Sequence, residues 1–107
     1  TANENTPKDL SKNQAYKNKE RKRLEAEERN KTYQKRAPLE KELSATEKII
    51  ASLEVRKSDF EKSLCDPQTH KDSLIVKKIN IELKNINTEL EKAYNTWMEI
   101  NVKLGEL

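Results

Sequence analysis

Apolar residues recur at alternating intervals of three and four through the last third of this chain. The positions that follow this alternation are Val76, Ile79, Leu83, Ile86, Leu90, Ala93, Trp97, Ile100, Leu104 and Leu107. This spacing is the a/d heptad pattern of a helix that buries one narrow stripe against another helix. The pattern therefore predicts a fold built from long paired helices.

A second stripe with the same alternation lies earlier in the sequence. Its members are Leu39, Leu43, Thr46, Ile50, Leu53, Lys57, Phe60 and Leu64. Lys57 is a polar residue at a seam position, and such a residue often fixes the register between two helices. The chain has one glycine and three prolines, so it lacks the residues that tight β-turns need. We therefore expect an all-α protein.

The segment CDPQTHKD, residues 65–72, separates the two stripes. Pro67 cannot continue the first helix, and Asp72 or Ser73 can cap the second. A connection this short places the two helices side by side and antiparallel. We predict an antiparallel two-helix coiled-coil hairpin over residues 38–107, with a helix at 38–65, a loop at 66–72 and a helix at 73–106.

The two stripes also predict a register. If residues whose numbers add to 143 face each other, Leu53 lies opposite Leu90 and Thr46 opposite Trp97. We expect Trp97 to pack in the seam, and Tyr94 to lie beside it. We expect the rod to be a monomer.

The first third of the chain has a different composition. Residues 1–36 contain only Leu10 and Leu24 from the set Leu, Ile, Val and Phe. Residues 17–36 carry nine Lys or Arg and four Glu, a net charge of +5, although the whole chain has a net charge of +3. The sequence predicts a flexible linker at 1–16 and a basic, partly helical arm at 17–37, ahead of the hairpin.

Clustered cations with an aromatic residue among them suit a phosphate backbone and stacking on an exposed base. The candidate nucleic-acid-binding residues are Lys17, Lys19, Arg21, Lys22, Arg23, Arg29, Lys31, Tyr33, Lys35 and Arg36. Secondary candidates at the hairpin tip are Arg56, Lys62, Lys77 and Lys78. Composition alone equally favours a solvated helix with ion pairs such as Arg21 with Glu25.

The sequence offers no catalytic constellation. His70 and Cys65 are the only residues of their types, and a single glycine cannot build a phosphate-binding loop. We expect no enzyme activity, no metal and no cofactor in this domain. No apolar run is long enough for a bilayer and no signal peptide occurs, so we expect a cytoplasmic protein without a membrane partner.

Three segments occur in an order that resembles one family. LEKELSATEKIIASLE, LCDPQTHKDS and LEKAYNTWMEI are similar to the C-terminal coiled-coil domain of ABC-F ATP-binding cassette ATPases. That family has a loop like L-A-D-P-x-x-Y and a final run like Y-x-x-W-x-E-L. The matching residues are Leu64, Asp66 and Pro67 in the loop, and Tyr94, Trp97 and Glu99 near the end. Cys65, His70 and Ile100 depart from the pattern.

The resemblance implies a larger parent protein whose two cassettes bind ATP and Mg²⁺ and which acts in translation on the ribosome. It also implies that this domain contacts ribosomal RNA or DNA. Because the chain begins with Thr1, we expect it to be a fragment of that parent. The alternatives are a structural or protein–protein interaction hairpin without nucleic-acid binding, and an arm that binds transfer RNA. The sequence leaves open which nucleic acid is bound, and whether the arm or the tip binds it.

Overall fold

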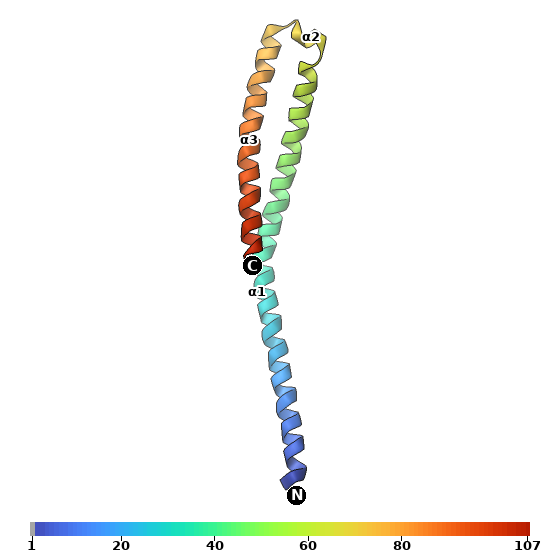
Figure 1. The fold of residues 1–107 in the computed structure, drawn as a ribbon, viewed down its shortest axis with the longest axis vertical. Helices are drawn as coiled ribbons and strands as arrows, with labels where there is room; N and C mark the ends of the chain where they lie inside the picture. Colours follow the sequence, from blue (N-terminus) through green and yellow to red (C-terminus); the bar gives the residue numbers. More distant parts are fainter. Residues whose placement is uncertain (1) are drawn as a thin grey trace. The chain divides into compact units, whose positions relative to one another are not determined.

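The computed structural model describes the backbone of residues 2–107 and the side chains of residues 12–107. It contains three helices, α1 (Ala2–Leu64), α2 (Pro67–His70) and α3 (Ser73–Gly105), and no strand within residues 2–107 (Figure 1). The all-α class predicted from the sequence is confirmed. The chain divides into two units, Thr1–Ala37 and Pro38–Leu107, and α1 contributes to both.

The second unit is a helical hairpin. The part of α1 that follows Pro38 runs alongside α3 in the opposite direction, and the chain reverses at α2 (Figure 1). Leu53 on α1 forms a buried cluster with Ile86 and Leu90 on α3, and Ile50 and Phe60 pack against this cluster. The cluster contains the predicted pair Leu53 and Leu90. Burial of this stripe supplies the main apolar contribution to the stability of the pair.

Two polar residues of the seam are accommodated in different ways. Thr46 is buried, and its hydroxyl donates a hydrogen bond of 2.9 Å to the backbone carbonyl of Glu42 one turn earlier. This bond satisfies the hydroxyl inside the seam without a partner on α3. Lys57 is half-buried, and its long aliphatic stem suits such a position because it can pack while the ammonium reaches water.

The reversal is organised by two aspartates. The Asp66 carboxylate accepts a hydrogen bond from the Gln68 amide at 3.0 Å, and Pro67 occupies the first turn of α2. The Asp72 carboxylate caps α3 by accepting from the amides of Leu74 and Ile75 at 3.1 and 3.3 Å. An aspartate followed by proline is a strong helix start, which explains why the expected loop 66–72 contains a short helix.

The beginning of α1 differs from the sequence prediction. Residues 1–16 were expected to be a flexible linker, but α1 starts at Ala2, and residue 1 lies outside the described backbone. The segment has no glycine, but Asn, Thr, Ser, Asp and Pro, which are weak helix formers, make up eight of its sixteen residues. Helix propensity therefore does not account for this part of α1. Pro38, which was expected to open the helix of the hairpin, instead lies inside α1.

Candidate nucleic-acid interface

The arm, residues 12–37 of α1, has two faces with different charge. At 3.6 residues per turn, about 160° of the helix circumference carries cations and tyrosines without any carboxylate between residues 12 and 37. We call this the acid-free face, and its members are Lys12, Tyr16, Lys19, Lys22, Arg23, Arg29, Tyr33 and Arg36. Its six cations extend along about 36 Å of helix. The basic excess of the arm therefore lies on one face.

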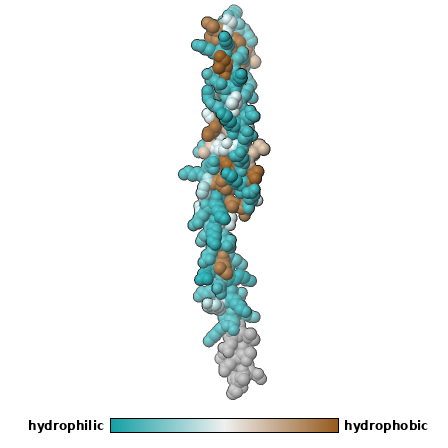
Figure 2. All heavy atoms as spheres, turned by 90° about the vertical axis from the view of Figure 1, so that its left-hand side faces the viewer, coloured by the Kyte–Doolittle hydropathy of each residue, from teal (hydrophilic) through white to brown (hydrophobic). Residues whose placement is uncertain are grey.

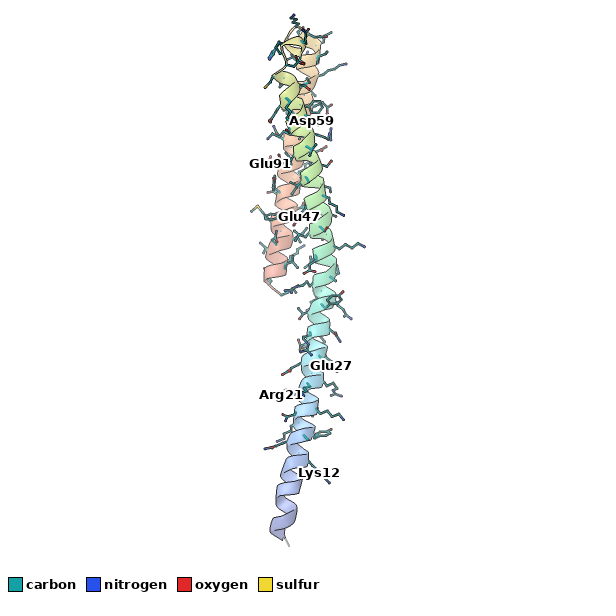
Figure 3. The ribbon with its side chains drawn as sticks, turned by 90° about the vertical axis from the view of Figure 1, so that its right-hand side faces the viewer. Lys12, Arg21, Glu27, Glu47, Asp59 and Glu91 are labelled. Atoms are coloured by element: carbon teal, nitrogen blue, oxygen red, sulfur yellow. The ribbon has the colours of Figure 1, made fainter. Side chains whose placement is uncertain are left out.

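The other face of the arm is electrically balanced. It carries four cations, Lys17, Arg21, Lys31 and Lys35, and four carboxylates, Glu20, Glu25, Glu27 and Glu28. Arg21 pairs with Glu25 at 3.8 Å, and Lys31 pairs with Glu28 at 3.9 Å. Lys12, Arg21 and Glu27 all project from the helix (Figure 3). Two of the four predicted cations of this face are thus paired with neighbouring carboxylates, and the face as a whole has no net charge.

Lys19, Lys22 and Arg29 make no ion pair with any of the side chains from 12 to 107. Arg23 does pair with Glu20, at 3.8 Å, across the edge of the acid-free face. Exposed pairs of this kind contribute at most about 1 kcal/mol, so a phosphate can replace Glu20 at little cost. The acid-free face therefore presents both unpaired cations and weakly held ones.

Both tyrosines of the acid-free face stand out from the helix. Tyr16 is 70% exposed and Tyr33 is 68% exposed. Tyr16 lines a shallow surface depression with Lys19, Glu20 and Arg23. Tyr33 lines a similar one with Glu28, Arg29, Thr32 and Arg36. An exposed ring beside cations can stack on a base while the cations hold the neighbouring phosphates.

Lys12 and Tyr16 were not among the residues predicted from the sequence, because residues 1–16 were expected to be a linker. The signal was present in the spacing. Lys12, Lys19 and Lys22 fall on one face when the helical period is carried back past Lys17. The absence of seam residues there concealed the helix.

The secondary candidates at the tip have no exposed tyrosine or tryptophan among them. Arg56 pairs with Glu82 on α3 at 3.7 Å, and both side chains are exposed, so this pair is as weak as that of Arg23 with Glu20. Lys62, Lys77 and Lys78 are exposed but have no tyrosine at helical spacing beside them. The tip cations therefore lack the exposed tyrosines that accompany the cations of the acid-free face.

Trp97 does not pack as fully as the sequence predicted. It remains 36% exposed, and its indole Nε1–H donates to Glu47 Oε1 at 3.4 Å. A seam assignment fixes the position of the Cα atom, but the indole is too wide to be enclosed between two helices alone. Trp97 therefore lies at the edge of the hairpin, with about a third of its surface in contact with water.

Two features are absent from the described part of the chain. No group of three His, Cys, Asp or Glu side chains gathers there in a way that could hold a metal ion. The described helices also include none with the length and apolar character needed to cross a bilayer.

The hairpin has a recognisable family signature. A family model described as the ABC transporter C-terminal domain matches residues 34–101. The match covers nearly the whole hairpin, and leaves most of the acid-free face outside it. Neither a curated protein nor a solved structure gives a significant match. Since the model matches more than half of the chain, this chain belongs to the ABC transporter C-terminal domain family.

Proposed function

We propose that this chain is the nucleic-acid-binding C-terminal appendage of an ABC-F-type ATPase, with ribosomal RNA or DNA as its ligand. The observation that carries the proposal is the acid-free face, where six cations and two exposed tyrosines share one side of a helix. A scaffold helix needs no such separation of charge. A helix that lies along phosphates benefits from it directly.

The cations supply affinity through counterion release. Each Lys or Arg that neutralises a phosphate lowers the slope of log affinity against log salt by about 0.7 for a single strand and 0.9 for a duplex. Six contacts on the acid-free face give a slope of about −4 to −5. The tyrosines add stacking of about 1–3 kcal/mol per base where bases are unpaired. Phosphate contacts do not read sequence, so we expect weak sequence preference.

The family membership supports a parent with ATP-binding cassettes, and the resemblance of the loop and end motifs supports the ABC-F branch. We propose that ATP and Mg²⁺ bind in that parent, that it works on the ribosome in the cytoplasm, and that this domain has no catalytic role. Two Walker A motifs and two ABC signature motifs encoded upstream of Thr1, without membrane spans, are the expected result. A transmembrane domain in the parent would contradict the ABC-F assignment.

The test compares two triple variants with the same total charge. The first replaces Lys19, Lys22 and Arg29 on the acid-free face by Gln, and the second replaces Lys17, Lys31 and Lys35 on the balanced face. Binding of a fluorescent single-stranded RNA and of a DNA duplex is measured by anisotropy from low to high salt. We expect the first variant to lose about half of the salt slope and the second to lose little.

Circular dichroism serves as the control, because all six residues are exposed and neither variant should change helicity. Equal losses in the two variants would mean that net charge alone attracts the polyanion, and would contradict a defined face. A wild-type protein that binds neither probe at low salt would contradict the proposed function itself.

A further inference from the structure

One flank of the hairpin seam is acidic along its length. On α1, Glu40, Glu47, Glu54 and Glu61 recur every seven residues. The row at the same flank of α3 is neutral and consists of Asn80, Asn87, Tyr94 and Asn101. The hydroxyl of Tyr94 donates to Glu54 Oε1 at 3.2 Å, and Trp97 donates to Glu47 as described above. These hydrogen bonds leave the negative charge of both carboxylates uncompensated.

The opposite flank is different, because Arg56 and Glu82 form an ion pair across it. Within the described side chains, Glu47, Glu54 and Glu61 have no cationic partner. An ion pair therefore crosses one flank of the hairpin, whereas the other flank carries carboxylates that attract positive charge.

Large apolar side chains lie exposed beside the acidic flank. Trp97 is 36% exposed, Tyr94 43%, Met98 58% and Val102 60%. Tyr94, Met98 and Val102 are spaced by four residues, so they form a ridge along α3. Figure 2 shows hydrophobic residues on the surface near the end of α3. A ridge of this spacing fits the groove of a crossing helix.

The border of the ridge is mainly acidic. Glu99 and Glu106 line a depression together with Met98 and Val102. Lys103 also lines it, so this depression has two carboxylates and one cation among its described residues. Glu91 lies one turn before Tyr94 on α3 and projects from the hairpin, and Glu47 lies on α1, where its carboxylate accepts from Trp97 (Figure 3). Phosphates are repelled from such a border, so a nucleic acid does not fit this surface.

We propose that this edge of the hairpin, formed by Tyr94, Trp97, Met98 and Val102 between glutamates, docks a basic amphipathic helix of a protein partner. The apolar ridge takes the apolar stripe of that helix. The carboxylates pair with Lys or Arg on either side of the stripe, which selects a basic partner and excludes an acidic one. The surface is independent of the acid-free face and carries the opposite charge.

The probe is a synthetic helical peptide with Leu at positions i, i+3, i+4 and i+7, Lys or Arg elsewhere, and no Trp or Tyr. Trp97 is the only tryptophan of the chain, so its emission reports on this edge. We expect a blue shift on binding, because the peptide covers the exposed part of the indole. A peptide of the same composition in scrambled order, and one with Glu in place of the cations, should both fail to bind.

The variant Met98→Ser with Val102→Ser should weaken binding at least about ten-fold, because two apolar contacts are lost. Its matched control is Leu74→Ser with Ile81→Ser, which removes two exposed apolar side chains elsewhere on α3 and should bind as the wild type does. Glu47→Gln with Glu54→Gln should weaken binding and reduce its dependence on salt.

Three results would overturn the proposal. Equal affinity for the scrambled peptide would reduce the interaction to charge attraction. Unchanged affinity of the Met98 and Val102 variant would show that the apolar ridge does not contact the peptide. Sedimentation that reveals self-association abolished by the Glu47 and Glu54 substitutions would make a second copy of this chain the occupant.

Discussion

At the scale of single residues, two aromatic side chains of α3 donate hydrogen bonds to carboxylates of α1: Tyr94 to Glu54 and Trp97 to Glu47. The hydrogen bond to Glu54 is the largest cause of a raised pKa at Tyr94, followed by partial burial and the negative charge of Glu54. Tyr94 thus keeps its proton more tightly in the folded chain than its ordinary pKa of 10.0 provides. The contribution of this contact is present below pH 10 and is lost as the pH rises through the folded pKa.

This contact can be tested by titrating Tyr94 through its near-ultraviolet absorbance, with Tyr16 and Tyr33 replaced by Phe so that only Tyr94 responds. We expect the midpoint to lie above 10.0. Glu54→Ala removes the acceptor and its charge, and should lower the midpoint. The same midpoint with and without Glu54 would show that the hydrogen bond does not hold the proton in solution.

At the scale of elements, the sequence predicted the helices whose buried side chains recur at a regular spacing. The heptad stripes gave the helices and the antiparallel pairing of Leu53 with Leu90, because regular burial leaves a regular pattern. The short helix α2 escaped, because four residues are too few to show a period. The helical residues before Lys17 were not predicted because their sequence has no apolar period. The exposure of Trp97 depends on the size of the indole, which spacing does not report.

The cap of α3 is an element that substitution can test. Asp72 accepts hydrogen bonds from the amides of Leu74 and Ile75, so Asp72→Ala should lower the free energy of unfolding by about 1 kcal/mol. Asp59→Ala is the matched control, since Asp59 is an exposed aspartate inside α1 (Figure 3). Urea denaturation should show no loss for the control. A similar loss in both variants would mean that Asp72 does not act as a cap.

At the scale of the whole molecule, the charges of the chain are sorted onto separate surfaces. The acid-free face lies in the unit Thr1–Ala37, and the acidic flank lies in the unit Pro38–Leu107. A net charge of +3 conceals both of them. The acid-free face and the balanced face of the arm differ in charge only when the residues are placed around a helix, because the overall composition averages the two faces. Composition alone left the arm equally suited to a solvated helix, and the projection of charges around α1 favours a binding face.

The central claim is that the acid-free face contacts nucleic acid, and lysine footprinting tests it most directly. The free chain and its complex with a single-stranded RNA are treated with an amine-reactive reagent, and each lysine is quantified by mass spectrometry. We expect Lys12, Lys19 and Lys22 to be protected in the complex, because phosphates cover their ammonium groups. Lys17, Lys31 and Lys35 on the balanced face, and Lys62, Lys77 and Lys78 at the tip, should react as in the free chain. Protection confined to the tip, or equal on both faces of the arm, would contradict the account.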